Sequence, residues 1–466
     1  MSITPDPTPN PAPSGRPYRP RSIFGPVVLI SLGVLFLAYN VGWLPGLSWI
    51  WFWTWFSRWW PALLILWGVV KVFEYTVARS KGEPAPRGIG GGGIVFLIFF
   101  VMCGLVASAI YRHRDDIRNW NIDDGNDWTF FGNRYDFTEN VAQPIADAAQ
   151  IKVTDGWGDI TVSPSADAQA HLFVHKHLQG DSQDEGNRLN DSTHPKFVQQ
   201  GKVWILDLAS GNFEHGRFNL DLQVPTNVAL SVTTRRGDIS VDQRAGDVDL
   251  STDRGALTAK NVKGNVTLRL HRGDATVDEV TGNVQIDGSG GDTTVSNVTG
   301  TLTVNGEYGG DSRFSKIGGQ VRFKSNRTDL QFAKLDGEFN MDRSDLRADS
   351  VTGPFRLETK YKEIHLEGVT GEVHIDDTNS PIEVETKAPL GAIDINSTHG
   401  GIEVSVPANA GLQVDAESKN GEINSDFTLN VDNQHRDATA HGTIGKGGPL
   451  MRLRLDRGTI QIKKHD

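Results

Sequence analysis

The chain has very little cysteine: Cys103 is the only one among its 466 residues. A single thiol cannot form a disulfide framework or a cysteine-based zinc site within one chain. The sequence also lacks a P-loop, a nucleophile elbow, a Cys/His pair and a zincin motif. We therefore expect no enzyme activity, no cofactor and no metal.

Positive charge is scarce in the larger, C-terminal part of the chain. Residues 1–114 contain ten basic and three acidic side chains, so the remaining residues hold 36 basic and 54 acidic ones. An acidic domain is poorly suited to neutralise phosphates, which excludes nucleic acid as the expected partner. A basic, apolar first part and an acidic, glycine-rich second part predict a membrane anchor that carries a soluble domain.

The first part of the chain has the composition of a membrane domain. Residues 1–22 contain seven prolines and almost no apolar side chain, which predicts a disordered tail. We expect a membrane domain at 23–111. Its three apolar segments, at about 23–41, 59–77 and 89–110, are the predicted transmembrane helices. Tryptophans cluster at 43–67, as is typical of a membrane–water interface, so membrane lipid is an expected partner.

Basic residues near these segments predict the orientation. The tail and the connection 78–88 carry three each, whereas the connection before residue 59 carries only Arg58. This charge bias predicts a cytoplasmic tail, and three crossings then place residues 112 onward on the extracytoplasmic side. An additional crossing by residues 49–59 would reverse the orientation.

Glycine returns every nine residues in the second part, at Gly237, Gly246, Gly255, Gly264, Gly273, Gly282, Gly291 and Gly300. A fixed period indicates units that bury their apolar faces only by stacking. Successive glycines lie in two different kinds of turn. The repeating unit is therefore eighteen residues long. Apolar residues alternate between the turns, which predicts a β-solenoid of stacked two-strand coils of about 18 residues, of either hand.

The expected fold is thus N-terminal transmembrane α-helices followed by an all-β repeat domain. A duplicated segment, 220–232 and 402–414, precedes a Gly-acid-Ile turn in both copies. We expect a stalk at 112–150, a β-strand N-terminal cap at 151–235, solenoid repeats at 236–405 and a C-terminal β-strand cap at 406–466.

One turn of each coil carries an acidic residue, and this column is the candidate ligand-facing site: Asp238, Asp274, Asp292, Asp311, Asp329, Asp345 and Glu363. We expect each acid to make an Asx-type bond to nearby backbone. Stacked carboxylates favour a counter-ion, but Arg272, Arg327 and Arg343 offer internal neutralisation. The repeat itself requires Gly-Asp at these turns, so the Arg-Gly-Asp spelling at 236–238 and 272–274 does not predict cell-adhesion recognition.

Two stretches resemble known bacterial families. Residues 25–44, with Gly33, Asn40 and Gly42, and the run Trp59-Trp60-Pro61-Ala-Leu-Leu-Ile-Leu-Trp67-Gly68 resemble the membrane region of LiaI/LiaF-like cell-envelope stress proteins. The Val-Pro entry and the Gly-Asp-Ile-x-Val units resemble an adhesin-type β-strand-repeat domain. The resemblances cover about 23–77 and 150–462. They imply a multi-pass bacterial inner-membrane protein with an extracytoplasmic β domain and an envelope protein or glycan as partner.

Three function classes remain. The favoured one is a membrane-anchored, non-enzymatic binding or signalling module connected with the state of the cell envelope. A surface adhesin or structural scaffold is the alternative. A β-helix carbohydrate-active enzyme comes third, because it would need catalytic clusters on long loops and these coils are short. The sequence does not determine the ligand or the oligomeric state.

Overall fold

The structure is a computed structural model, in which residues 133–465 are described except 146–147, 211–212, 214–215 and 434–435. Before residue 133 only scattered helical positions between 58 and 105 are described. The chain divides into two compact units, Met1–Gly132 and Asn133–Asp466, and each is treated by itself.

In the first unit, the described positions are all helical, in two stretches at 58–80 and 98–105. The expected tail, the span 23–41, and much of the other two spans lie outside the described residues. Among the positions that are described, no helix has both the length and the apolar character needed to cross a membrane.

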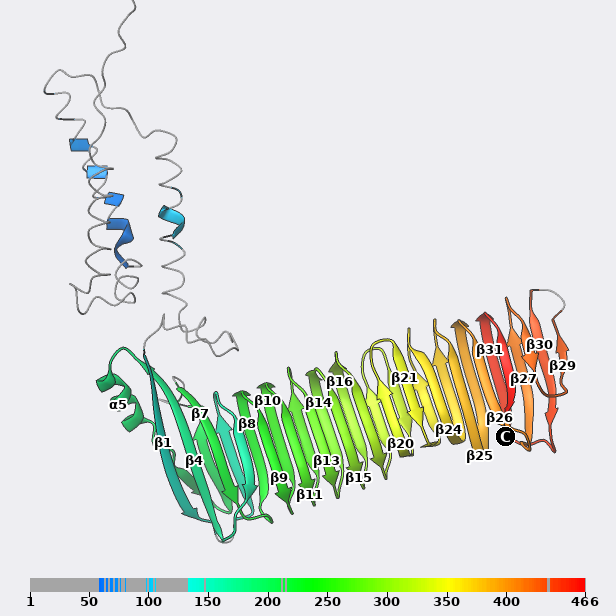
Figure 1. The fold of residues 1–466 in the computed structure, drawn as a ribbon, viewed down its shortest axis with the longest axis horizontal. Helices are drawn as coiled ribbons and strands as arrows, with labels where there is room; N and C mark the ends of the chain where they lie inside the picture. The colour runs from blue at the N-terminus through cyan, green and yellow to red at the C-terminus, as the bar shows by residue number, and fades with distance from the viewer. Residues whose placement is uncertain are drawn as a thin grey trace, which may run out of the picture. The chain divides into compact units, whose positions relative to one another are not determined.

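The second unit is built almost entirely of strands, which confirms the all-β repeat domain (Figure 1). The strands form two rows, each hydrogen-bonded from neighbour to neighbour. Row A runs in the order β5 Phe197–Gln200, β6 Val203–Leu208, β2 Gln150–Asp155, β8 Ala229–Arg236, β10 Val248–Arg254, β12 Val266–Leu270, β14 Val284–Gly290, β16 Leu302–Tyr308, β18 Val321–Lys324, β19 Asp329–Phe332, β23 Phe355–Glu358, β24 Glu363–Asp377, β25 Ile382–His399, β31 Leu450–Arg457, β27 Leu412–Ser418, β30 Ala438–Ile444 and β29 Asn430–Asp432.

The strands of row B are given in the same order, from the N-terminal end of the stack to its C-terminal end. Its order is β1 Asn133–Pro144, β4 Gln169–Gly180, β7 Gly216–Val224, β3 Ile160–Pro164, β9 Ile239–Arg244, β11 Leu257–Val262, β13 Ala275–Val280, β15 Thr293–Val298, β17 Ser312–Ile317, β20 Lys334–Met341, β21 Asp345–Asp349, β24, β25, β26 Ile402–Pro407, β32 Ile460–His465 and β28 Ile423–Ser425. The long strands β24 and β25 run through both rows, and the short β22 Val351–Thr352 pairs with β20 and β24.

The eighteen-residue period sets which residues lie side by side in neighbouring coils. Val248 lies beside Leu230 on one side and Val266 on the other, each eighteen residues away, in parallel strands. Successive side chains of a strand point to opposite faces, and the inward ones, such as Val248 and Leu250, are 2 % and 0 % exposed. The core therefore lies between the two rows along the length of the unit.

The glycines of the Arg-Gly-Asp-type turns are required by close stacking. Gly255 has a φ of +141°, a conformation that side chains disfavour. A Cβ added there would also lie 2.1 Å from the carbonyl oxygen of Gly237 in the preceding coil. The same two constraints hold at Gly273, so the glycine period records where neighbouring turns touch.

The N-terminal end of the unit is covered by an antiparallel layer and one helix. Residues 133–144, which the sequence analysis places in a stalk, form β1 and pair with β4 along their full length. Helix α5, Gln183–Ser192, starts with Ser182 accepting a hydrogen bond from the backbone amide of Glu185. Lys176 of β4 is fully buried, and its Nζ reaches both Glu139 of β1 and Asn190 of α5. This contact joins the helix to both strands.

Asp155, at the end of β2, predicts a pH dependence of stability. Burial raises the pKa of this carboxyl to about 7, the charge of Asp159 adds to the shift, and the backbone amides of Gly156 and Trp157 oppose it only in part. In the unfolded chain the group titrates near pH 4. The unfolded state therefore loses its proton first, and stability falls as the pH rises from about 4 to about 7, by at most about 1.4 kcal/mol per pH unit.

The Asp155→Asn variant is expected to lack this loss. Denaturant unfolding of both proteins across this pH range measures the difference, which should grow in favour of the variant toward pH 7. Parallel pH profiles would show that Asp155 keeps an ordinary pKa in the folded protein.

Candidate functional site

The regular alternation between the two rows stops after β18. Elsewhere in the repeats a strand of row A is followed along the chain by a strand of row B. Here β18 turns back into β19, its antiparallel neighbour in row A, and β20 then turns back into β21 in row B. The prediction that Asp329 and Asp345 stand in ordinary coil turns is therefore wrong, because the turns before them close hairpins within one row.

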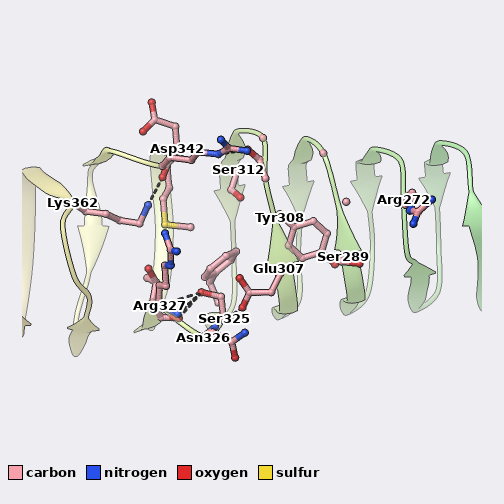
Figure 2. A pocket seen from close by; sticks show the side chains of 18 of the residues that line it. Arg272, Ser289, Glu307, Tyr308, Ser312, Ser325, Asn326, Arg327, Asp342 and Lys362 are labelled. Atoms are coloured by element: carbon pink, nitrogen blue, oxygen red, sulfur yellow. Dashed lines mark hydrogen bonds between the residues drawn. The ribbon is translucent and has the colours of Figure 1, made fainter.

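These two hairpins open a groove along one edge of the stack. Residues 309–311 cross from β16 in row A to β17 in row B, but the turns at 325–328 and 342–344 stay in their own rows. A groove with a volume of about 810 Å³ lies between them and the neighbouring turns (Figure 2). It is the candidate functional site of the β unit.

Phenylalanines fill the core at this interruption. Phe314 and Phe339 stack with ring centroids 5.2 Å apart, Phe332 lies 6.1 Å from Phe339, and Phe355 lies 6.0 Å from Phe332. All four rings are fully buried. They replace the smaller aliphatic pairs of the regular coils and hold the two hairpins against each other.

The groove carries an excess of positive charge. Five basic residues line it: Arg272, Arg327, Arg343, Lys360 and Lys362. None of them forms an ion pair with any residue that the structure describes. Arg343 donates from Nε to the carbonyl oxygen of Gly309 at 3.1 Å, and the mostly buried Lys362 donates to the carbonyl oxygen of Asp342.

The two carboxylates of the groove do not cancel this charge. Asp342 Oδ1 accepts the backbone N–H groups of Ser344 and Asp345, both at 2.7 Å. These bonds lower the pKa of Asp342 and fix its carboxylate in the hairpin turn. Glu307 Oε1 accepts the backbone N–H of Asn326 at 2.5 Å. Both acids thus hold turns in place, and the site is suited to an anionic ligand.

Two tyrosines complete the groove. The hydroxyl of Tyr308 is buried and has no hydrogen-bond partner among the described residues. Burial, with the nearby charge of Asp287, raises its pKa, so the hydroxyl stays protonated and able to donate. Tyr361 on the rim is 67 % exposed and has a φ of +63°. An aromatic residue rarely adopts this conformation outside functional sites and tight turns.

The predicted acidic column has a different role in the regular coils from the one expected. Asp238 Oδ1 accepts the backbone N–H of Ala256 at 2.7 Å, Asp274 Oδ1 that of Asp292 at 2.8 Å, and Asp292 Oδ1 that of Asp311 at 2.9 Å. These acids do not make the expected Asx-type bond, because their oxygens join one coil to the next. Asp274, Asp292 and Asp311 lie together as a stacking ladder.

The hairpins separate the remaining acids of the column. Asp329 lies in row A beside Lys324 at 3.6 Å, and Asp345 lies in row B near Arg347 at 3.5 Å. Glu363 contacts His365 at 3.0 Å. No group of three metal-ligating side chains that could hold an ion occurs among the described residues.

The ladder makes a prediction about Asp292. The Asp292→Ala variant loses the acceptor for the amide of Asp311 and is expected to destabilise this part of the stack by about 1 kcal/mol. Asp292→Asn keeps an Oδ1 acceptor and is the matched control. Hydrogen exchange at the Asp311 amide should accelerate in the alanine variant only; equal acceleration in both would assign the effect to charge instead.

Most groove residues were missed by the sequence analysis. In the repeat pattern the three arginines only neutralise the acidic column, and Tyr308, Lys360 and Lys362 follow no rule that marks them. A usable signal is the loss of glycine: Thr328 and Ser344 stand where the earlier turns have Gly237, Gly255 and Gly273. Turns without that glycine cannot stack in the same close geometry.

Comparisons with known proteins agree with both resemblances. The family model described as the LiaF transmembrane domain matches residues 24–112, and the model described as Toastrack DUF4097 matches residues 148–463. A search of curated proteins finds no match. The first match indicates a membrane location for the N-terminal part.

Several solved structures are similar to this chain at low identity. A candidate cell adhesion protein from Clostridium sporogenes has 12 % identity and a TM-score of 0.16, covering 72 % of this chain and 100 % of its own. A candidate adhesin from Bacteroides fragilis has 12 % identity and a TM-score of 0.16, and a candidate lipid-binding protein from Parabacteroides distasonis has 11 % and 0.20; each covers 71 % of this chain and 97 % of its own. Scores this low carry no argument. The Toastrack match spans more than half of the sequence, and the chain therefore belongs to the Toastrack DUF4097 family, with a LiaF transmembrane domain before it.

Proposed function

We propose that this protein is a membrane-anchored, non-enzymatic binding or signalling module that responds to the state of the cell envelope. Three transmembrane helices between a cytoplasmic tail and residue 112 would hold the β unit on the extracytoplasmic side of the inner membrane. The β unit would act as a β-solenoid, a rigid stack whose ligand site is the groove. The match to a LiaF transmembrane domain supports the anchor.

The groove is the observation that supports binding. Stacking alone would continue the eighteen-residue coil through residues 319–352, and the two hairpins there break it. In a region with 54 acidic and 36 basic side chains, five basic residues gather in this groove without ion pairs to described residues. Concentrated like charge costs free energy unless a ligand of opposite charge binds.

A catalytic role has less support. Glycoside hydrolysis generally uses two carboxylic groups, one of them able to give up a proton. Glu307 and Asp342 are both held by backbone amides, and the pKa of Asp342 is lowered, which disfavours a general acid. A surface adhesin remains the alternative to a sensor, because a groove for an anionic ligand suits both.

A promoter reporter tests the proposal. Deletion of the gene should change the output of an envelope-stress promoter, and the full chain should restore it. Unchanged output, with binding of the β unit to whole cells or matrix, would contradict the sensor and favour the adhesin. Cleavage of a polysaccharide by the purified chain would contradict both.

A further inference from the structure

The spacing of the free cations indicates how long the ligand is. Arg272 follows β12, and Lys360 follows β23, which lies five strands further along row A. Neighbouring strands are about 4.8 Å apart, so these two side chains start roughly 24 Å apart along the stack. Arg327 lies between them, in the turn of the β18–β19 hairpin. A single phosphate or carboxylate cannot contact all three, whereas an extended chain with several negative charges can.

The groove between these cations offers hydrogen-bonding groups beside apolar surface. The hydroxyl of Tyr308 can donate one hydrogen bond and lacks a partner among the described residues. Asn326 and the backbone of the glycine turns 290–291 and 309–310 also line the site. Two of the lining residues are wholly apolar, Phe323 and Met341, and they are only 3 % and 5 % exposed. The ligand should therefore carry hydroxyl groups as well as charge.

We propose that the groove binds an extended anionic glycan, a linear chain of sugar or polyol units that carry phosphate or carboxylate groups. Its charges would pair with Arg272, Arg327 and Lys360, and a hydroxyl or charged oxygen would bond to Tyr308. Figure 2 labels Arg272, Arg327 and Tyr308. Tyr361 on the rim would cover the apolar face of a unit. This inference rests on the proposed function, because it names the ligand class of the same site.

Other macromolecules fit this groove less well. An acidic peptide would bind as an added strand only at an unpaired strand edge. All four hairpin strands already have a neighbour on both sides: β18 and β19 in row A, β20 and β21 in row B. A membrane surface requires inserted apolar side chains, and Tyr361 is the only strongly exposed large apolar residue of the groove.

The test uses the purified full chain in detergent micelles and fluorescently labelled oligomers. An oligogalacturonate supplies carboxylates, a glycerol-phosphate oligomer supplies phosphodiesters, and a neutral galactan oligomer supplies neither. At least one anionic oligomer should bind, more weakly at high salt because salt screens charge, and the neutral oligomer should not. Comparison of the two anionic oligomers identifies which charged group the ligand carries.

Matched variants locate the binding. R327Q/K360Q should weaken binding about tenfold or more, as expected for the loss of two charge-assisted hydrogen bonds. The control R322Q/K263Q removes the same charge from exposed residues outside the groove and should change affinity by less than about twofold. Equal losses in both variants would show that net charge, and not the groove, decides binding.

Tyr308→Phe separates a ligand contact from a structural role. The hydroxyl has no partner in the described protein, so its removal should leave stability unchanged or raise it slightly, while affinity falls about fivefold. An unchanged affinity would remove Tyr308 from the site.

Three results would overturn the glycan assignment: binding of the neutral oligomer, equal binding of a single-stranded dT oligomer, or binding of neither anionic oligomer. The last of these leaves the promoter-reporter result standing, so a failed ligand class can be distinguished from a failed function.

Discussion

Replacing Arg244 with valine is expected to destabilise the first regular coils by roughly 3–5 kcal/mol. Arg244 ends β9 and is 2 % exposed. Its guanidinium donates to the carbonyl oxygens of Val224 at 3.0 Å, Pro225 at 2.7 Å and Val228 at 2.7 Å. Burial lowers its pKa to about 10, which still leaves it charged at neutral pH.

The repeat pattern taken alone predicts the opposite result. Arg244 lies beside Val262 of the next coil, which is followed by Val280 and Val298, so valine restores the consensus. The valine variant, however, removes the guanidinium donor from all three carbonyl groups. The carbonyl of Val224 keeps the backbone N–H of Ser165 at 2.9 Å, whereas each carbonyl left buried without a donor costs about 1–3 kcal/mol. Loss of these bonds should outweigh better packing.

Hydrogen exchange at residues 224–244 measures this effect locally, because stacked repeats need not unfold as one unit. Arg235→Val, at an exposed position of β8, is the control and should change exchange little. A valine variant as stable as the wild type would show that water or relaxation satisfies the three carbonyls.

Phe339→Ala should destabilise the two hairpins by about 3–5 kcal/mol, the usual cost of deleting a buried phenylalanine. Its ring is fully buried and contacts both Phe314 and Phe332, so it joins a regular coil to the hairpin of row A. Loss of the ring leaves a cavity in the core between the two rows.

Phe339→Leu keeps most of the volume and should cost less than about 1.5 kcal/mol. Denaturant unfolding of the full chain in micelles, read together with hydrogen exchange at 321–349, compares the two variants. Equal, small losses would mean that the hairpins are held by their backbone hydrogen bonds and not by the phenylalanine cluster.

The regular part of the fold could be predicted because one constraint repeats. A glycine such as Gly255 is required wherever a Cβ would collide with the preceding turn, here at 2.1 Å from the carbonyl oxygen of Gly237, and residues such as Val248 and Leu250 must point inward. Both requirements leave a periodic trace in the sequence, so the strand pattern and the eighteen-residue register follow from it.

The groove could not be predicted from the same pattern. Leu330 and Phe332 alternate as in any coil, and the alternation is equally satisfied by an antiparallel hairpin in one row and by a parallel strand in the next. The turns do differ, since Thr328 and Ser344 replace glycine, but a missing glycine does not by itself specify a hairpin. The groove also depends on contacts between residues far apart in sequence, such as Arg343 with Gly309.

The hydrogen bonds of the acidic column also could not be predicted from the sequence pattern. The spacing in the sequence correctly predicts that Asp274 and Asp292 lie in one column. Local turn chemistry, however, predicts the wrong hydrogen-bond donors for their carboxylate oxygens. The acceptor serves an amide eighteen residues away, which only the stacked arrangement shows.

The most direct test of the central claim is the side of the membrane on which the β unit lies. In a Cys103→Ser chain, a cysteine is introduced either at Gln200, which is exposed on β5, or at Ser2 in the expected cytoplasmic tail. A membrane-impermeant maleimide is then applied to intact and to permeabilised spheroplasts. The account predicts labelling of residue 200 in intact spheroplasts and of residue 2 only after permeabilisation; the reverse pattern would contradict it.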